Sequence, residues 1–212
     1  MPHDAPTSPT IVVVDDDSSI RRSLQYLLES VHYRVQTFVC AADALGWPEL
    51  SAASCIITDL RMPGLSGLEF HQTLLERQVE VPTIVITGHG DVPAVVRALK
   101  AGVFDFIQKP FNDQALLDTV ARAVSDWATA RAKTLAFTDL EARRESLSPR
   151  EREVFEQVVL GLANKNIATR FDISEKTVEA HRANIMRKMQ AESFAALVRM
   201  AVALEKSERR AA

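Results

Sequence analysis

Chemically suggestive residues follow four short apolar runs of this 212-residue chain. Asp15-Asp16-Asp17 comes after Ile11–Val14, Asp59 after Cys55–Thr58, Thr87-Gly88 at the end of Thr83–Thr87, and Lys109-Pro110 after Asp105–Gln108. If these runs are parallel strands of one sheet, their carboxyl ends meet at a single edge, which is where such sheets bind ligands.

The residue types expected at that edge suit phosphate chemistry. Several carboxylates close together repel one another and need a compensating cation, for which Mg²⁺ is the natural choice. Lys109 adds a positive charge, Thr87 a hydroxyl donor, and Gly88 room for close approach. These are the parts of a phosphoryl-transfer site with a carboxylate as acceptor. Any one of them also has an ordinary structural explanation, and Asp17 is expected to cap a helix.

Strand and helix patterns alternate over the first 125 residues, which predicts an α/β domain with a doubly wound parallel sheet. The expected sheet has five strands in the flavodoxin-like order 2-1-3-4-5, so that strands one and three are neighbours. The predicted strands are Ile11–Val14, Arg34–Phe38, Cys55–Thr58, Thr83–Thr87 and Asp105–Gln108. The predicted helices are Ser18–Ser30, Ala41–Leu45, Gly67–Arg77, Val92–Lys100 and Asp113–Val124.

The charge of the chain is divided unevenly. From Glu141 onward there are 14 Lys and Arg against 11 Asp and Glu, whereas the preceding part has 11 against 17. We therefore expect an acidic domain over residues 8–125, a helical linker over 126–145, and a more basic domain over 146–212. The basic domain is a candidate for binding a polyanion.

Composition excludes several classes of protein. A hydrophobic content of 47% with 25% charged residues is typical of a globular protein and not of a disordered one. No apolar run approaches the ~20 residues of a membrane helix, so we expect no membrane association. The N-terminal Met1–Asp4 shows no secretory signal. Cys40 and Cys55 lie in apolar segments and are predicted to be reduced thiols of a cytoplasmic protein.

The basic domain contains only helix patterns, and two of them form a helix-turn-helix. Ser148-Pro149-Arg150-Glu151 is a helix start with its cap, and Gly161 ends that helix. Asn164–Arg170 is the expected second helix, Phe171-Asp172-Ile173 the turn, and Ser174 the cap of a third helix that ends near Met189. In such units the helix after the turn enters the major groove of DNA.

A wheel of the third helix separates an apolar face from a polar one. Val178, Ile185 and Met189 are expected to pack inward. On the polar face, Asn184 and Arg187 suit base edges, whereas lysines suit phosphates. On charge alone, a solvated basic surface is the favoured explanation. The candidate DNA-binding residues are Lys165, Lys176, Thr177, Glu179, Ala180, Arg182, Ala183, Asn184, Arg187 and Lys188.

The acidic domain resembles the receiver domain of two-component response regulators over Thr10–Val124. The resemblance is carried by Val13-Val14-Asp15-Asp16-Asp17, Thr58-Asp59-Leu60-Arg61-Met62-Pro63-Gly64, Thr87-Gly88-His89-Gly90-Asp91 and Phe106-Ile107-Gln108-Lys109-Pro110-Phe111. It implies that Asp59 is phosphorylated by a sensor histidine kinase. Asp16, Asp59 and the backbone carbonyl of Arg61 would hold Mg²⁺, with Asp15 acting through a water.

The resemblance further implies a phosphorylation switch. Thr87 and Lys109 would bind the phosphoryl oxygens, the Lys109-Pro110 bond would be cis, and Phe106 would turn inward as Thr87 moves. On residue type alone, an ordinary core aromatic of an alternating strand is the stronger interpretation of Phe106. The face of the fourth helix and fifth strand would then form a homodimer.

The basic domain resembles the helix-turn-helix of the LuxR/NarL/FixJ family over Ser146–Val202, and the whole chain resembles the FixJ subgroup. Leu147–Val154, Asn164–Ala168 and Thr177–Met186 carry this resemblance. Many members have Lys where this chain has Glu179, which affects the DNA sequence preferred. The chain is therefore expected to be a phosphorylation-activated transcription regulator that binds paired half-sites of promoter DNA, with RNA polymerase as a further candidate partner.

Two other functions use the same residues differently. A hydrolase with an aspartyl-phosphate intermediate, as in haloacid-dehalogenase-like phosphatases, would place its nucleophile in an Asp-x-Asp arrangement after the first strand, whereas here Asp59 stands alone after the third. A phosphate-sink or adaptor protein would have no use for the basic domain. We therefore expect a regulator and not an enzyme.

Overall fold

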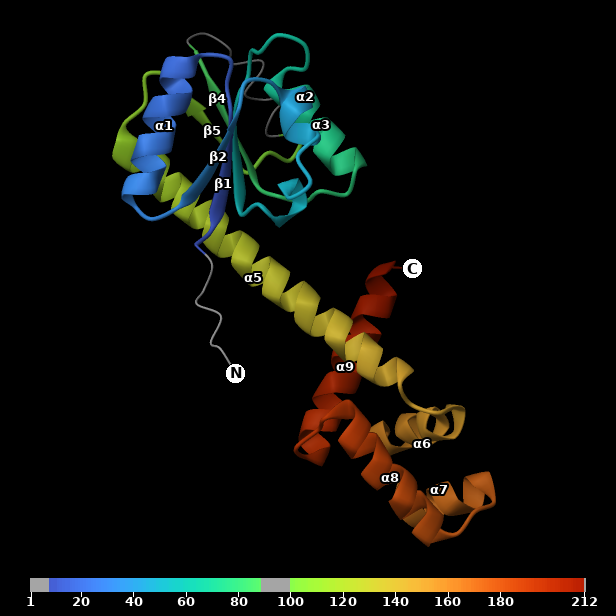
Figure 1. Ribbon diagram of the computed structural model, residues 1–212. Coiled ribbons are helices and arrows are strands. Elements are labelled where there is room, and N and C mark those ends of the chain that lie inside the picture. Colours follow the sequence, from blue (N-terminus) through green and yellow to red (C-terminus); the bar gives the residue numbers. More distant parts are fainter. Residues whose placement is uncertain (1–7, 89–99, 212) are drawn as a thin grey trace. The chain divides into compact units, whose positions relative to one another are not determined.

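The computed structural model describes residues 8–88 and 100–211, which divide between Ala130 and Arg131 into two compact units. The first is an α/β unit and the second is helical (Figure 1). The predicted helix Val92–Lys100 lies outside the described residues except for its last position. Within the described ranges, no helix combines the length and the hydropathy that crossing a membrane requires.

The first unit contains a five-stranded parallel sheet in the order β2-β1-β3-β4-β5, as predicted. Its strands match the expected runs to within a residue at either end. They are β1 (Thr10–Val14), β2 (Arg34–Phe38), β3 (Cys55–Asp59), β4 (Thr83–Thr87) and β5 (Asp105–Gln108). The three central strands β1, β3 and β4 are almost wholly buried, as expected for strands covered on both faces.

Helices cover both faces of this sheet (Figure 1). Ile11, Val13 and Ile57 point to the face packed against α1 (Ser18–Ser30) and α5 (Asp113–Glu145). Val12 and Ile56, one residue out of step, point to the face packed against α2 (Ala41–Leu45) and α3 (Gly67–Glu76). This alternation follows from the two-residue period of side chains along a strand. A short 3₁₀ helix, η1 (Leu50–Ala52), precedes β3.

Helix α5 is much longer than the predicted Asp113–Val124, because it continues without a break through the expected helical linker to Glu145. The segment contains no glycine and no proline to stop it, and it is rich in alanine. Near its end, Arg143 and Asp139 form an ion pair one turn apart. Phe137 and Leu140 pack against the core of the second unit, so residues 131–145 belong to that unit.

The second unit has its own core, built from α6 (Pro149–Val159), α7 (Asn164–Phe171), α8 (Glu175–Met189) and α9 (Phe194–Ala211). Ser148 and Glu151 form the predicted capping box at the start of α6. The centre of this core is formed by Val154 from α6, Ile167 from α7, and Val178 and Ile185 from α8, each of which is 0% exposed. Leu197, Ala201 and Leu204 complete this core from α9.

Candidate functional site

A lysine bridges two carboxylates at the carboxyl edge of the sheet. The register pairs Val14 of β1 with Thr58 of β3, so Asp15 and Asp59 occupy equivalent places at the ends of neighbouring strands. The Nζ atom of Lys109 lies 3.0 Å from Asp15 Oδ2 and 2.6 Å from Asp59 Oδ1. The predicted convergence of Asp15, Asp59 and Lys109 is therefore confirmed.

Burial strengthens the electrostatics of this group. Asp15 is 2% exposed and Asp59 is 9% exposed. Burial raises the pKa of Asp15, although the hydrogen bond from Lys109 opposes that rise. Burial alone would lower the pKa of Lys109, but its hydrogen bonds to Asp59 and Asp15 raise that pKa above the ordinary lysine value. Lys109 therefore stays a cation over the physiological pH range.

Main-chain groups fix both carboxylates. Asp59 Oδ2 accepts a hydrogen bond from the N–H of Arg61 at 2.6 Å, and Asp15 Oδ1 accepts one from the N–H of Asp17 at 2.8 Å. Asp17 in turn caps α1 through the N–H groups of Ser19 and Ile20, as predicted. The pocket is therefore held in place before any ligand arrives.

The remaining predicted pocket residues lie on the adjoining strands. Thr87 ends β4 and is buried, and its carbonyl accepts the N–H of Lys109 at 2.7 Å. The Lys109-Pro110 bond is cis, as the family resemblance implied. Phe106 on the edge strand β5 is half-buried and packs against Leu60, Val85 and Val103. Gly88 is exposed at the end of β4.

The predicted trio of carboxylates is only partly assembled, because Asp16 is exposed while Asp15 and Asp59 are buried. Over 8–88 and 100–211, no three acidic, histidine or cysteine side chains come close enough to hold a metal ion by themselves. The charge of Lys109 compensates the two buried carboxylates instead. The oxygen donors still suit Mg²⁺, which needs only one or two carboxylates and fills its other positions with carbonyl, water and phosphate oxygens.

Two residues that support this pocket were missed from the sequence. A Cβ added to Gly67, the first residue of α3, would lie 2.3 Å from the carbonyl oxygen of Asp59, so only glycine fits there. Arg21 on α1 donates from Nη1 to the carbonyl of Asp15 at 2.6 Å. A glycine directly after the helix cap Ser66 is a sequence signal that two backbone segments lie close together there. No sequence signal indicates that the side chain of Arg21 contacts the Asp15 carbonyl.

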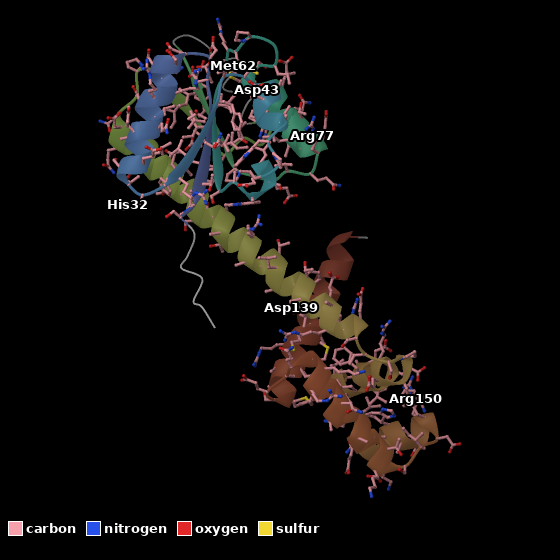
Figure 2. All side chains as sticks on the ribbon, viewed as in Figure 1. His32, Asp43, Met62, Arg77, Asp139 and Arg150 are labelled. Carbon is pink, nitrogen blue, oxygen red and sulfur yellow. The ribbon has the colours of Figure 1, made fainter. Side chains whose placement is uncertain are left out.

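In the second unit, α7 and α8 form the predicted helix-turn-helix. Asp172 ends α7 in the left-handed conformation, with φ of 53°, and Ser174 caps α8 through the N–H of Thr177. Arg150 of α6, labelled in Figure 2, stabilises the turn. Its guanidinium lies 4.4 Å from the centre of the Phe171 ring and donates to the Phe171 carbonyl.

The two faces of α8 divide as the wheel predicted. Val178, Ile185 and Met189 are each 0% exposed and pack into the core. The polar face of α8, together with Lys165 of α7, is open to solvent. The exposed candidates are Lys165, Lys176, Thr177, Glu179, Ala180, Ala183, Asn184 and Arg187. Arg187 Nη2 lies 3.4 Å from Asn184 Oδ1, so the two residues best suited to base edges are neighbours.

Two candidates for DNA contact are engaged within the unit instead. Lys188 donates to Glu151 at 2.7 Å and to the carbonyl of Ser146 at 3.0 Å. Arg182 is half-buried, with its guanidinium 5.6 Å from the centre of the Phe194 ring. The helix wheel could not separate these residues from the exposed ones because their partners come from α6 and α9, which the wheel does not include.

The fold and these two sites define a class of protein: a regulator in which a receiver domain is joined to a helix-turn-helix domain. Residues 11–121 match the response regulator receiver domain, and residues 145–201 match the bacterial regulatory proteins of the LuxR family. The chain belongs to the FixJ-like response regulators of the LuxR family. It is a transcription regulator of a two-component system. Its receiver domain implies a sensor kinase as partner, and its LuxR-type domain implies DNA binding.

Individual relatives agree over most of the chain. It is 44% identical to the transcriptional regulatory protein FixJ of Rhizobium meliloti over 93% of this chain and 97% of that protein. It is 39% identical to the response regulator protein TodT of Pseudomonas putida over 97% of this chain and 90% of that one. The solved structure of the response regulator StyR is 40% identical, with a TM-score of 0.85, over 92% of this chain and 98% of that chain.

Proposed function

We propose that the carboxylate of Asp59 accepts a phosphoryl group from a sensor histidine kinase, and that this modification drives dimerisation and sequence-specific DNA binding. The observation that carries the proposal is the position of Lys109 Nζ, 2.6 Å from Asp59 Oδ1. A buried carboxylate next to a fixed cation is placed to keep its new phosphoryl oxygens neutralised.

The transfer itself needs little covalent chemistry from the protein. An oxygen of Asp59 attacks the phosphorus of a phosphohistidine, the Asp59 O–P bond forms, the histidine N–P bond breaks, and the freed imidazole takes up a proton. Lys109 neutralises the charge of the phosphoryl oxygens, and Thr87 supplies a hydroxyl donor from the end of β4. Arg61 holds Asp59 in position through its N–H.

We assign the Mg²⁺ site to oxygen atoms of the same pocket. Asp16, Asp59 and the carbonyl of Arg61 would hold Mg²⁺ directly, and Asp15 through a water. When bound, Mg²⁺ neutralises charge on the phosphoryl oxygens during transfer.

We assign the structural response to phosphorylation to the surface of the edge strand β5. If Thr87 turns toward the phosphoryl group, Phe106 gains room to pack deeper beside Val85 and Val103. This reshapes the surface of β5, which pairs with β4 alone at the sheet edge. The fourth helix, which would form the rest of the dimer face, lies outside the described residues. A dimer would present two α8 helices to half-sites about 34 Å apart, or a multiple of that spacing.

The test compares the full chain with Asp59→Asn, with and without acetyl phosphate and Mg²⁺. Asp59→Asn keeps the size of the side chain but cannot form the acyl phosphate. We expect phosphodonor to increase the dimer fraction, measured by light scattering, and the affinity for duplex DNA only in the wild type. A variant that dimerises and binds DNA with phosphodonor as the wild type does would overturn the proposed switch.

A further inference from the structure

We infer that Arg21 is a positioning residue of the phosphoacceptor pocket, and that it holds the peptide group from which Asp16 approaches Mg²⁺. The inference rests on the proposed function, because it concerns the same metal. It begins from one contact: Arg21 Nη1 donates to the main-chain carbonyl of Asp15 at 2.6 Å, which is short even for a hydrogen bond from a charged donor.

The carbonyl of Asp15 belongs to the planar peptide group that joins Asp15 to Asp16. Fixing the oxygen of that plane therefore fixes the direction in which the chain enters Asp16. The side chain of Asp16 is exposed, so packing does little to orient it. Its approach to a metal consequently depends on the backbone that carries it.

The neighbouring groups of this loop are held by other contacts. The N–H of Asp15 donates to Phe38 at 3.3 Å, and its side chain contacts Asp17 and Lys109. The side chain of Asp17 caps α1. These contacts hold Asp15 and Asp17, and the contact from Arg21 holds the peptide group that leads from Asp15 to Asp16.

The sequence places Arg21 where it can reach back. Asp17 caps α1, and the N–H of Arg21 donates to the Asp17 carbonyl at 3.0 Å, so Arg21 closes the first turn of the helix. Its long side chain then returns along that turn to Asp15. Groups that orient metal ligands in this way change metal affinity by about 10-fold to 100-fold when removed.

The hydrogen bond and the charge of Arg21 predict opposite changes in Mg²⁺ affinity when Arg21 is replaced. Arg21 is a cation close to the carboxylates, so removing its charge alone would strengthen binding of a dication. Removing its hydrogen bond would loosen the peptide group and weaken binding. Arg21→Lys keeps both a positive charge and a donor for the Asp15 carbonyl, whereas Arg21→Gln removes the charge and the charged donor. The direction in which Arg21→Gln changes Mg²⁺ affinity therefore shows which of the two effects dominates.

Arg22 is the matched control. It is exposed on the same helix, and its Nε donates to the Ser18 carbonyl at 3.3 Å within that helix. Arg22→Gln therefore removes the same charge from the next position without touching the Asp15–Asp16 peptide group. A thermal melt of each variant checks that the fold is unchanged.

The experiment titrates the full chain with Mg²⁺ in the absence of any phosphodonor and follows the amide resonances of Asp15, Asp16 and Asp17. We expect the Mg²⁺ dissociation constant to rise about 10-fold in Arg21→Gln and less in Arg21→Lys, with Arg22→Gln like the wild type. With acetyl phosphate, saturating Mg²⁺ should restore the Arg21→Gln rate, since only metal binding is impaired.

Equal or tighter Mg²⁺ binding by Arg21→Gln would overturn the inference and leave Arg21 a charged surface residue. The two proposals fail separately. If the wild type binds Mg²⁺ but is never phosphorylated, the proposed function fails while the titration still decides the role of Arg21. If the wild type is phosphorylated and Arg21→Gln binds Mg²⁺ normally, only the role of Arg21 is lost.

Discussion

Lys109 and Asp59, fifty positions apart in the chain, meet at the end of the sheet with 2.6 Å between Nζ and Oδ1. Asp59 is the last residue of β3 and Lys109 directly follows β5, and these two strands are not neighbours, since β4 lies between them. The long lysine side chain spans that strand, which is possible because the carboxyl ends of all three strands lie at one edge. The contact ties Asp59 to the edge strand that carries Phe106.

Replacing Lys109 by Gln should disable the pocket. The change removes the cation that compensates Asp15 and Asp59, so we expect phosphorylation by acetyl phosphate to slow about 100-fold. The pKa of Asp15, already raised by burial, should rise further without the opposing hydrogen bond. Lys133→Gln on the exposed part of α5 is the control. Phosphorylation of Lys109→Gln at the wild-type rate would contradict the role given to Lys109.

Gly67→Ala should displace Asp59 without altering any charge. The added methyl would lie 2.3 Å from the Asp59 carbonyl oxygen, so α3 or the end of β3 must shift. We expect a loss of about 2 kcal/mol in the free energy of unfolding, measured with urea, together with slower phosphorylation. Gly46→Ala adds a methyl with ordinary clearance of 3.5 Å and should be tolerated. Equal stability of the two variants would refute this explanation.

The sequence was sufficient to predict the central strands because β1, β3 and β4 are short runs rich in β-branched residues, with a polar residue at the end of the strand or directly after it. It also placed Asp15, Asp59, Thr87 and Lys109 together, since parallel strands share one carboxyl edge. The helical state of residues 126–145 could be predicted because the segment contains no helix breaker, but the sequence pattern did not show that the linker and the preceding helix form the single helix α5. Arg21, Lys188 and Arg182 depend on side-chain reach between elements, which a one-dimensional pattern does not contain.

The second unit should lose stability in acid through Glu151. Hydrogen bonds from Lys188 and from the N–H of Ser148 lower the pKa of Glu151 below its ordinary value of 4.5. Because the folded pKa is the lower one, this contribution is complete above pH 4.5 and is lost as the pH falls through the folded value. Hydrogen exchange of α8 in the full chain, measured across this range, should report the loss.

Glu151→Gln should flatten that pH dependence and make exchange of α8 faster at neutral pH. Glu153→Gln is its matched control, because Glu153 lies two residues away in an exposed pair with Arg150. If hydrogen exchange of α8 in Glu151→Gln depends on pH as it does in the wild type, Glu151 is ruled out as the cause of the acid destabilisation.

Replacing Lys176 and replacing Lys188 should have different effects on the affinity for duplex DNA, although both are lysines of α8. Lys176 is exposed, so Lys176→Gln should weaken duplex binding and reduce the slope of log affinity against log salt by about 1, without changing stability. Lys188→Gln breaks the contact with Glu151 and should chiefly destabilise the unit. Titrations of duplex DNA at several salt concentrations, paired with urea unfolding, separate the two. A larger change of salt slope for Lys188→Gln would reverse the assignment.

The central claim is that Asp59 is the phosphoacceptor, and intact-mass measurement tests it most directly. The full chain is incubated with acetyl phosphate and Mg²⁺, trapped with borohydride, and digested to locate the modified residue. We predict that the wild type gains one phosphoryl group, that the trapped product maps to Asp59, and that Asp59→Asn gains none. A wild type that gains no phosphoryl group, or an Asp59→Asn variant that is labelled equally, would contradict the account.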